Sequence, residues 1–421
     1  MLKSVGHKVL VYFVGKAITA LISLMIIPLF IRWFGSENYG KYILTYVTFL
    51  IFISGSIGWI NQSIIKFHGD FANRDQFYKK AHNISYIFSL LSVIPLLLTV
   101  SFSLSTSSSF LVYALLGVAY VFACRYTSLL IERQSEIRPL EYTLAEIIRL
   151  LSFLIATYFF RLVPYLQSIE VIFSGLLVSY FLSYLYLKKS LRINDFKVNI
   201  KVDFQLVKKF FFFGIPLSVW MVFSPGTNGV DKYILNYFVG PAVLAYYAAV
   251  YDVIFKVFIQ VVNPINSVFQ PLLMNIHSEG DGHLFTRALK RALLYLFIVC
   301  TPLLCAVYFF QDYILGDYLG ISDAHALGIL KKLILPIALS AVIWQIAIIL
   351  QKRLEAKEQT LQLTIYIIIV VLINSIFSIW LIPKYDFSVL GYINLGGSLM
   401  YLTLIFFTNK TLLEKEKSTC K

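Results

Sequence analysis

The chain has 421 residues, of which 59% are hydrophobic and only 14% are charged, and its net charge is +14 at pH 7. Because soluble proteins carry about 45–50% apolar and about 25% charged residues, this composition excludes a water-soluble fold and requires lipid around most of the apolar surface. The four cysteines lie in apolar stretches or in the C-terminal tail, which indicates free thiols rather than a disulfide framework or a metal site.

Twelve apolar runs follow one another along the chain, and each is long enough to cross a bilayer, for which about 20 mostly apolar residues suffice. The first run is too long for the core of a signal peptide, so we expect it to be retained as a span. The sequence therefore predicts an all-α polytopic membrane protein. The runs cover 9–31, 42–62, 84–104, 110–131, 140–160, 169–187, 210–235, 242–273, 292–311, 326–350, 360–382 and 388–408.

The distribution of Lys and Arg between the connections predicts the orientation of these spans. With the N-terminus in the cytoplasm, the inside segments hold 25 basic residues, and the outside segments and outer span ends hold 5 to 7. This bias predicts a multi-pass membrane protein with both termini in the cytoplasm. Topology and attraction to anionic lipid headgroups account for the net charge, so it needs no nucleic-acid partner.

The longest connection, 188–209, is basic and lies at the middle of the chain. It predicts an N-terminal lobe at 1–187 (spans 1–6), a C-terminal lobe at 210–409 (spans 7–12) and a cytoplasmic tail at 410–421. The other connections are too short to hold a soluble domain, and no Walker A motif is present, so ATP hydrolysis on this chain would not power transport.

A weak internal repeat supports two related halves, a common plan in transporters. The segment that ends the first span can be aligned with the segment that ends the seventh. Each is followed directly by the next span. The alignment pairs Gly35 with Gly240, Gly40 with Ala245, and Tyr42 with Tyr247.

Six charged residues are candidates for the bilayer core, where each charge costs roughly 2.5–3.5 kcal/mol on insertion scales and indicates a function. They are Lys16, Arg125, Glu146, Arg149, Asp252 and Lys256.

Asp252 and Lys256 lie four residues apart on the eighth span, a favourable spacing for an acid followed by a base. Gln260, Asn263 and Ser267 continue the same face at helical period, which indicates one wall of a water-filled cavity. The alternative is a structural ion pair between packed helices.

Glu146 and Arg149 share a face of the fifth span, and the alternative to a functional role is a self-neutralising pair. Lys16 and Arg125 each have the alternative of snorkelling to the cytoplasmic interface.

The seventh span is interrupted by the sequence SPGTNG at 224–229, and Asp231 and Lys232 follow at once. A broken membrane helix must line a cavity or be buried in protein, so this segment predicts a gate with an adjacent charge pair. A plain kink near the outer surface is the alternative. The histidines do not pair with Cys or carboxylates at metal-site spacing, so we expect no metal, no cofactor and no catalytic triad. The residues assigned to the hinge are Pro225, Gly226 and Gly229.

Three segments, 28–44, 58–70 and 229–253, resemble the polysaccharide-transporter branch of the multidrug/oligosaccharidyl-lipid/polysaccharide exporter superfamily, and more narrowly O-antigen flippases of the Wzx type. The resemblance implies two six-helix lobes forming a V around a central cavity, and alternating access. It implies an undecaprenyl-pyrophosphate-linked oligosaccharide as cargo, membrane lipids as surroundings, and the polymerase and chain-length proteins of the same pathway as partners.

The resemblance also implies a cationic cavity that receives the pyrophosphate. Here the cations would be Lys16, Arg125, Arg149 and Lys256, which outnumber the two intramembrane acids and give a net charge of +2. A dianionic headgroup would find this charge favourable.

Three other functions stay open. A cation-coupled drug antiporter on the same fold would need acidic residues without a basic excess. A flippase for the peptidoglycan precursor often has fourteen spans rather than twelve. A membrane polysaccharide polymerase or glycosyltransferase, which would be an enzyme, usually needs a sizeable external loop with catalytic groups, and the outside loops here are as short as 105–109.

Overall fold

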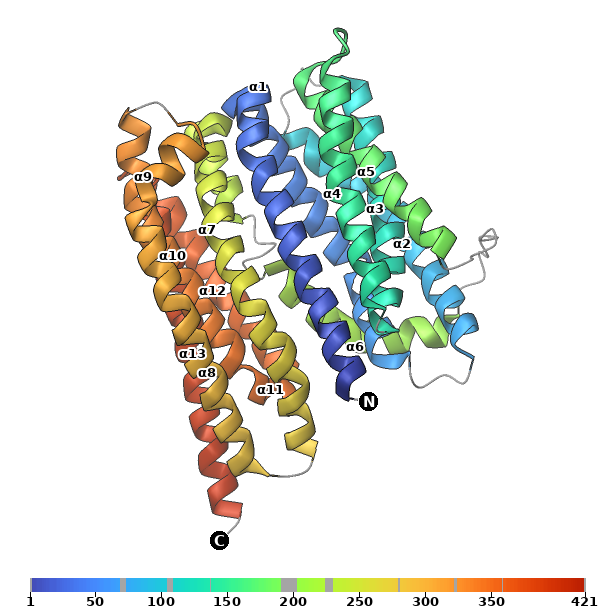
Figure 1. The fold of residues 1–421 in the computed structure, drawn as a ribbon, viewed down its shortest axis with the longest axis vertical. Helices are drawn as coiled ribbons and strands as arrows, with labels where there is room; N and C mark the ends of the chain where they lie inside the picture. Colours follow the sequence, from blue (N-terminus) through green and yellow to red (C-terminus); the bar gives the residue numbers. More distant parts are fainter. Residues whose placement is uncertain are drawn as a thin grey trace. The chain divides into compact units, whose positions relative to one another are not determined.

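The protein is described by a computed structural model in which the described residues are helical except for short turns (Figure 1). No strand occurs among them, which confirms the predicted all-α class. The described residues are 2–68, 73–103, 109–136, 138–190, 203–223, 230–278, 281–321, 324–357 and 359–419.

Helix α1 (Leu2–Phe67) contains two spans joined by a sharp turn at Gly35. Gly35 has φ 79° and ψ 163°, a backbone conformation that favours glycine because it has no Cβ. The ring centroids of Phe30 and Tyr42 lie 5.9 Å apart, whereas twelve residues of straight helix would separate them by about 18 Å. The chain therefore reverses, and α1 has a first arm (2–34) and a second arm (36–67).

Helix α7 (Val230–Ser278) repeats this turn at Gly240, which has φ 80° and ψ 174°. The side chains of Lys232 and Asp252 meet across the turn at 3.4 Å, although twenty residues of straight helix would separate them by about 30 Å. The first arm of α7 is 230–239 and the second is 241–278. The aligned glycines thus have the same backbone conformation, so the structure confirms the alignment of Gly35 with Gly240.

The remaining helices agree closely with the predicted spans. Eleven helices among the described residues are long and apolar enough to cross a membrane, and α1 supplies two spans. The predicted seventh span is divided between α6 and the short first arm of α7. The helices are α2 (Arg74–Ser103), α3 (Phe110–Ser135), α4 (Pro139–Arg161), α5 (Ser168–Ser190), α6 (Phe204–Phe223), α8 (Gly282–Phe309), α9 (Gln311–Tyr313), the π-helical turn η1 (Ile314–Tyr318), α10 (Ala324–Leu350), α11 (Lys352–Ala356), α12 (Thr360–Leu381) and α13 (Val389–Thr419).

Two compact units make up the chain, Met1–Gly229 and Val230–Lys421. In the first unit α6 packs tightly on the second arm of α1. A Cβ placed on Gly214 would lie 2.1 Å from the carbonyl oxygen of Trp59, so only glycine allows this approach. The hydroxyl of Ser63 donates to the carbonyl of Phe210 at 3.1 Å and adds a polar link. Thus α6, which we expected to open the C-terminal lobe, groups with the first unit.

The second unit is built on α7, α8, α10, α12 and α13. The rings of Trp344 and Tyr401 stack with centroids 4.8 Å apart between α10 and α13. Ser340 and Ser398 are buried between the same two helices and share a hydrogen bond of 2.7 Å. Large apolar side chains remain exposed along helices of both units, as expected of faces that meet lipid.

Candidate functional site

Lys16 and Glu146 form an ion pair within the first unit. The Lys16 Nζ atom lies 2.7 Å from Glu146 Oε2 and donates to the Tyr142 hydroxyl at 3.2 Å. Gly15 makes this contact possible, because a Cβ on it would lie 2.0 Å from Thr143 and would separate the first arm of α1 from α4. Lys16 is therefore held inside the unit by a carboxylate, with its side chain 38% exposed.

Arg149 lies one turn beyond Glu146 on α4 and faces a cage of tyrosines. Its guanidinium is 5.6 Å from the ring centre of Tyr180, and Tyr46 and Tyr126 are close enough to interact with it electrostatically. Glu146 also contributes to the electrostatics of Arg149, but its ion pair is with Lys16. One carboxylate is thus shared between two cations, rather than neutralising Arg149 alone.

Arg125 on α3 lies against an aromatic ring of the neighbouring helix. Its guanidinium is 3.8 Å from the centre of the Tyr86 ring on α2, a distance typical of a close cation–π contact. Its side chain is half-buried. Among the four predicted charges of the first unit, three are cations and one is a carboxylate, so this group carries a net charge of +2.

Asp252 binds two lysines in the second unit. Its Oδ1 atom lies 3.4 Å from Lys232 Nζ and its Oδ2 atom lies 3.1 Å from Lys256 Nζ. The side chain of Lys232 is 7% exposed, whereas that of Lys256 is 44% exposed. Lys232 therefore neutralises Asp252 in the interior, and Lys256 keeps an accessible ammonium group.

Asp231 contacts a different partner from its neighbour in sequence. Its Oδ2 atom accepts a hydrogen bond of 2.6 Å from the hydroxyl of Tyr247, and Asn394 donates to the same hydroxyl at 2.9 Å. This contact links both arms of α7 to α13. The four predicted charges of the second unit sum to zero, unlike those of the first unit.

The rest of the predicted polar face and hinge is described only in part. The Oε1 atom of Gln260 is buried and has no hydrogen-bond partner in the described part of the chain, and Asn263 is half-buried. The side chain of Ser267 is outside the described set. The predicted hinge residues Pro225, Gly226 and Gly229 also lie outside the described residues, so their role stays a prediction.

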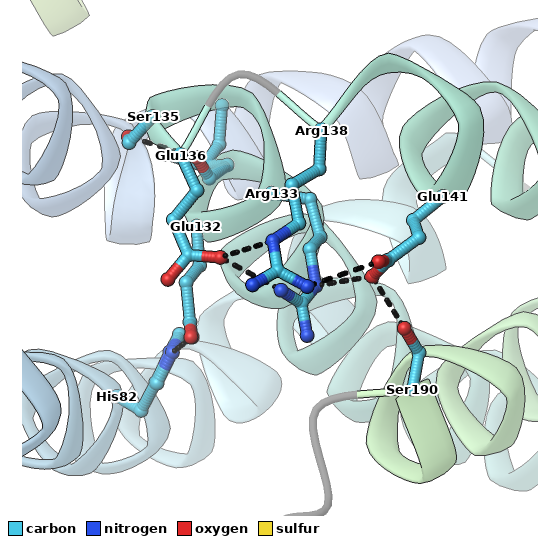
Figure 2. Close-up of polar contacts among 9 residues, drawn as sticks. His82, Glu132, Arg133, Ser135, Glu136, Arg138, Glu141 and Ser190 are labelled. Atoms are coloured by element: carbon cyan, nitrogen blue, oxygen red, sulfur yellow. Dashed lines mark hydrogen bonds and ion pairs between the residues drawn. The ribbon is translucent and has the colours of Figure 1, made fainter.

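A charged network at one end of α2–α5 was missed by sequence reasoning (Figure 2). Arg133 is 3% exposed and forms ion pairs with Glu136 at 2.7 Å and Glu141 at 2.8 Å. Beside it, the Nε2 atom of His82 lies 2.6 Å from Glu132 Oε2, and both side chains are buried. The sequence does contain a dense run of charged residues at 132–141, but its basic residues were used only to predict the orientation of the spans.

The second unit carries a related turn at the end of α10. There Lys352 and Glu355 form an ion pair of 2.8 Å at the same three-residue spacing as Arg133 and Glu136. Both pairs lie where the fourth span of a six-span half gives way to the fifth. This adds a second point of internal repetition to the one at Gly35 and Gly240. Among the described residues no group of three His, Cys, Asp or Glu side chains could hold a metal ion.

Comparison with known proteins defines the class. The fold is similar to that of a lipid II flippase MurJ in an inward closed conformation, at a TM-score of 0.76 and 15% identity over 95% of this chain and 87% of that chain. It is also similar to a transporter of the MOP superfamily from Pyrococcus furiosus, at a TM-score of 0.74 and 12% identity over 97% and 95% of the two chains. At these identities the likeness establishes the fold, that of a polytopic α-helical membrane protein.

The family follows from the sequence match. Residues 5–277, more than half of the chain, match the family described as polysaccharide biosynthesis protein, and the chain belongs to that family. It is 28% identical to a "Putative O-antigen transporter" of Shigella flexneri over 128 residues, which are 30% of each protein. The family match and the fold agree with the resemblance noted in the sequence.

Proposed function

We propose that the protein is a flippase that moves an undecaprenyl-pyrophosphate-linked oligosaccharide, an O-antigen or similar repeat unit, from the cytoplasmic to the periplasmic leaflet. The observation that carries this proposal is the excess of cations in the first unit, where Lys16, Arg125 and Arg149 are predicted intramembrane charges accompanied by one predicted carboxylate, Glu146, which pairs with Lys16. Such an excess of intramembrane cations is costly unless an anion is bound during the transport cycle.

The geometry of the group suits a pyrophosphate headgroup. Arg149 presents a planar donor fork, which binds phosphate oxygens in a bidentate manner. The tyrosines around it, Tyr46, Tyr126 and Tyr180, offer flat apolar faces and hydroxyl groups. Sugars have apolar faces and hydroxyls of their own, so the same cage suits the first sugars next to the pyrophosphate.

Within the second unit, we propose Lys256 as a cation that binds phosphate. It is the more exposed of the two lysines bound to Asp252. Its ammonium group can turn toward a phosphate while the Asp252–Lys232 pair stays intact. We propose alternating access between two lobes, with 188–209 on the cytoplasmic side and 224–229 as a hinge.

The excess of cations also weighs against other cargo. A cationic drug would be repelled by a group with a net charge of +2, and that group has one carboxylate to receive a coupling cation. A lipid II flippase shares the fold and would meet the same pyrophosphate chemistry, so only the sugars distinguish the two cargos. We place the protein in the bacterial inner membrane with both termini cytoplasmic, where polymerase and chain-length proteins of the same pathway would act on its product.

Export in cells tests this proposal. A strain that lacks its polysaccharide flippase should regain surface polysaccharide when it expresses this chain together with the matching glycosyltransferases. Arg149→Gln should abolish export and Arg149→Lys should restore part of it, with equal amounts of protein in the membrane. Rescue of a strain deficient in lipid II flipping, without rescue of polysaccharide export, would instead assign the chain to peptidoglycan precursor transport.

A further inference from the structure

The ends of three helices in the first unit meet in one cluster of aromatic rings. Phe67 ends α1, Phe77 lies in the first turn of α2, and Phe210 lies in the second turn of α6. The ring of Phe67 stacks on that of Phe210 with centroids 6.3 Å apart, and the rings of Phe77 and Phe210 are 5.9 Å apart. The second arm of α1 and the starts of α2 and α6 are therefore held together at one end of the unit.

Basic side chains surround this cluster and outnumber the acids. In the described segments 64–68, 73–80 and 203–210, six exposed Lys or Arg side chains accompany two carboxylates, which leaves a net charge of +4. The network in Figure 2 lies beside the same helix α2, but its carboxylates are already paired within that network. The six cations are Lys66, Arg74, Lys79, Lys80, Lys208 and Lys209, and the two carboxylates are Asp75 and Asp203. This end of the unit thus keeps an excess of positive charge.

Two of the lysines are held over rings of the cluster. The Lys209 Nζ atom is 4.1 Å from the centre of the Phe67 ring, and the Lys66 Nζ atom is 5.9 Å from that of Phe213. The centres of these two rings are 5.2 Å apart. Cation–π attraction favours an ammonium group at each ring. One ammonium group from α1 and one from α6 are therefore gathered in one place before any anion binds.

The face of α6 beside these lysines carries exposed aromatic rings. Lys208 shares this face with three phenylalanines, at spacings of three and four residues along the helix. They are Phe204, Phe211 and Phe212, which are 78%, 50% and 71% exposed. Exposed apolar surface of this kind marks an interaction site, and on a membrane helix it is suited to the acyl chains of a lipid.

The boundary between polar and apolar surface on α6 falls at Lys208 and Lys209. Residues 210–223 contain no charged side chain. The ring of Phe211 lies 6.0 Å from that of Trp59, which fixes this face to the second arm of α1. A lysine at such a boundary places its stem along apolar surface and its ammonium group in the polar layer, where a phospholipid has its phosphate.

A merely solvated surface is the alternative, because Lys and Arg are abundant in the cytoplasmic connections of membrane proteins. Charges that act only on topology need no fixed position. Here Lys66 and Lys209 are held over packed rings, and Lys208 lies within one turn of the exposed rings. This arrangement matches a phosphate with chains beside it, and a zwitterionic lipid lacks the net charge that would compensate the excess of cations.

We propose that the ends of α1 and α6 bind one anionic phospholipid. Its phosphate contacts the ammonium groups of Lys66, Lys208 and Lys209, and its acyl chains lie along Phe211 and Phe212. Lysine binds phosphate as a point charge, so the site selects net negative charge rather than the shape of a headgroup. The site does not depend on the proposed function, since none of its residues belongs to the cations proposed to bind cargo.

Native mass spectrometry of the purified full chain tests the site, with phosphatidylglycerol and phosphatidylcholine of the same acyl chains as probes. The wild type should bind the first phosphatidylglycerol more tightly than the first phosphatidylcholine. Each cation near an anionic lipid contributes about 1 kcal/mol, which corresponds to roughly a fivefold change in affinity. Lys66→Gln, Lys208→Gln and Lys209→Gln together should therefore weaken phosphatidylglycerol binding on the order of a hundredfold and leave phosphatidylcholine binding unchanged.

The matched control removes three exposed lysines of the second unit. Lys331 and Lys332 each pair with an aspartate, and the Lys384 Nζ atom lies 4.2 Å from the centre of the Trp380 ring. Replacing these three lysines by Gln changes the net charge equally, but should lower the affinity for phosphatidylglycerol by less than about twofold, because distant exposed charges are screened. Equal losses in the two triple variants would show attraction to net charge alone and would overturn the site.

Other outcomes separate the headgroup from the chains. Phe211→Ser combined with Phe212→Ser should weaken both lipids and keep the preference for phosphatidylglycerol. Equal affinities of the wild type for the two lipids would overturn the proposal. Displacement of phosphatidylglycerol by an equal concentration of inorganic pyrophosphate would assign the lysines to a free anion instead. If the triple variant does not fold, Lys208→Gln with an unchanged melting temperature should still lose roughly fivefold in affinity, and an unchanged affinity would refute the site.

The cargo site is distinguished by a variant outside this end of the unit. Arg149→Gln should keep the preference for phosphatidylglycerol while it loses export. Loss of that preference in Arg149→Gln would place the lipid at the proposed cargo site and overturn a separate one. Normal export by Arg149→Gln would contradict the proposed function and leave the lipid site standing.

Discussion

The two lysines bound to Asp252 should respond very differently to mutation, because one is buried and the other is accessible. Removing a partner from a buried pair typically costs about 3–5 kcal/mol, since a charge is left uncompensated. Asp252→Asn leaves the charge of Lys232 buried without its partner carboxylate, because the Lys232 side chain is only 7% exposed. Lys256 is 44% exposed, so Lys256→Ala should cost only about 0–1 kcal/mol, as for surface pairs.

Two quantities are measured for each variant. The first is the free energy of unfolding of the purified protein in mixed micelles, and the second is export in the strain that lacks its polysaccharide flippase. Lys256→Ala should keep near wild-type stability and lose export, whereas Asp252→Asn should lose both. Lys41→Ala is a matched control, because Lys41 and Glu37 form another i,i+4 pair in the first unit, at 2.7 Å. Equal destabilisation by Asp252→Asn and Lys256→Ala would refute the reasoning, and normal export by Lys256→Ala would remove the proposed phosphate contact.

The charge swap of Asp252 and Lys256 is less informative than the sequence suggests. On the sequence alone, Asp252→Lys combined with Lys256→Asp should preserve a purely structural pair. In the structure the new lysine at position 252 would meet Lys232, which is buried and positively charged. We therefore expect the swapped variant to be as destabilised as Asp252→Asn. Lys256→Met, which keeps an unbranched side chain one atom shorter than lysine and removes the charge, is the cleaner probe of function.

Three further predictions concern the backbone, the pH dependence and the topology. Gly240→Ala should destabilise the protein by about 1–2 kcal/mol in an unfolding assay, because its φ of 80° disfavours a side chain, and an unchanged stability would contradict the turn. Hydrogen bonds from Lys80 and from the start of α6 lower the pKa of Asp203, so its stabilisation is present above its unfolded pKa of about 3.9 and is lost as the pH falls through the lower folded pKa. Asp203→Asn should remove this part of the acid dependence of the melting temperature, and an unchanged profile would refute the assignment. With the natural cysteines replaced, an impermeant thiol reagent on intact cells should label a cysteine at 105–109 but not one at 188–209, and the reverse pattern would overturn the orientation.

The positions of the spans could be predicted from sequence because each depends on a local property. A run of apolar residues long enough for the bilayer is visible in the sequence itself. The alignment of Gly35 with Gly240 could be made from the sequence, and the structure adds that both glycines have positive φ at a turn. The sequence did not show that helix continues almost up to the turning residue on both sides.

The partners of the charged residues could not be predicted, because pairing was sought along single helices. Glu146 and Arg149 share a face, yet the ion pair of Glu146 is with Lys16, 130 positions away. Asp231 and Lys232 are neighbours, yet the lysine side chain binds Asp252 across the turn of α7. Such contacts depend on which helices pack together, and a single sequence contains no local signal for that.

Translocation in vesicles tests the central claim most directly. Purified protein is reconstituted with a fluorescent undecaprenyl-pyrophosphate-linked oligosaccharide, and the fraction that becomes accessible to an impermeant quencher is followed over time. We predict rapid translocation by the wild type, loss of it in Arg149→Gln, partial recovery in Arg149→Lys, and little movement of the same lipid without pyrophosphate. Wild-type rates in Arg149→Gln, or equal transport of the lipid without pyrophosphate, would contradict a cationic site that carries the headgroup across the membrane.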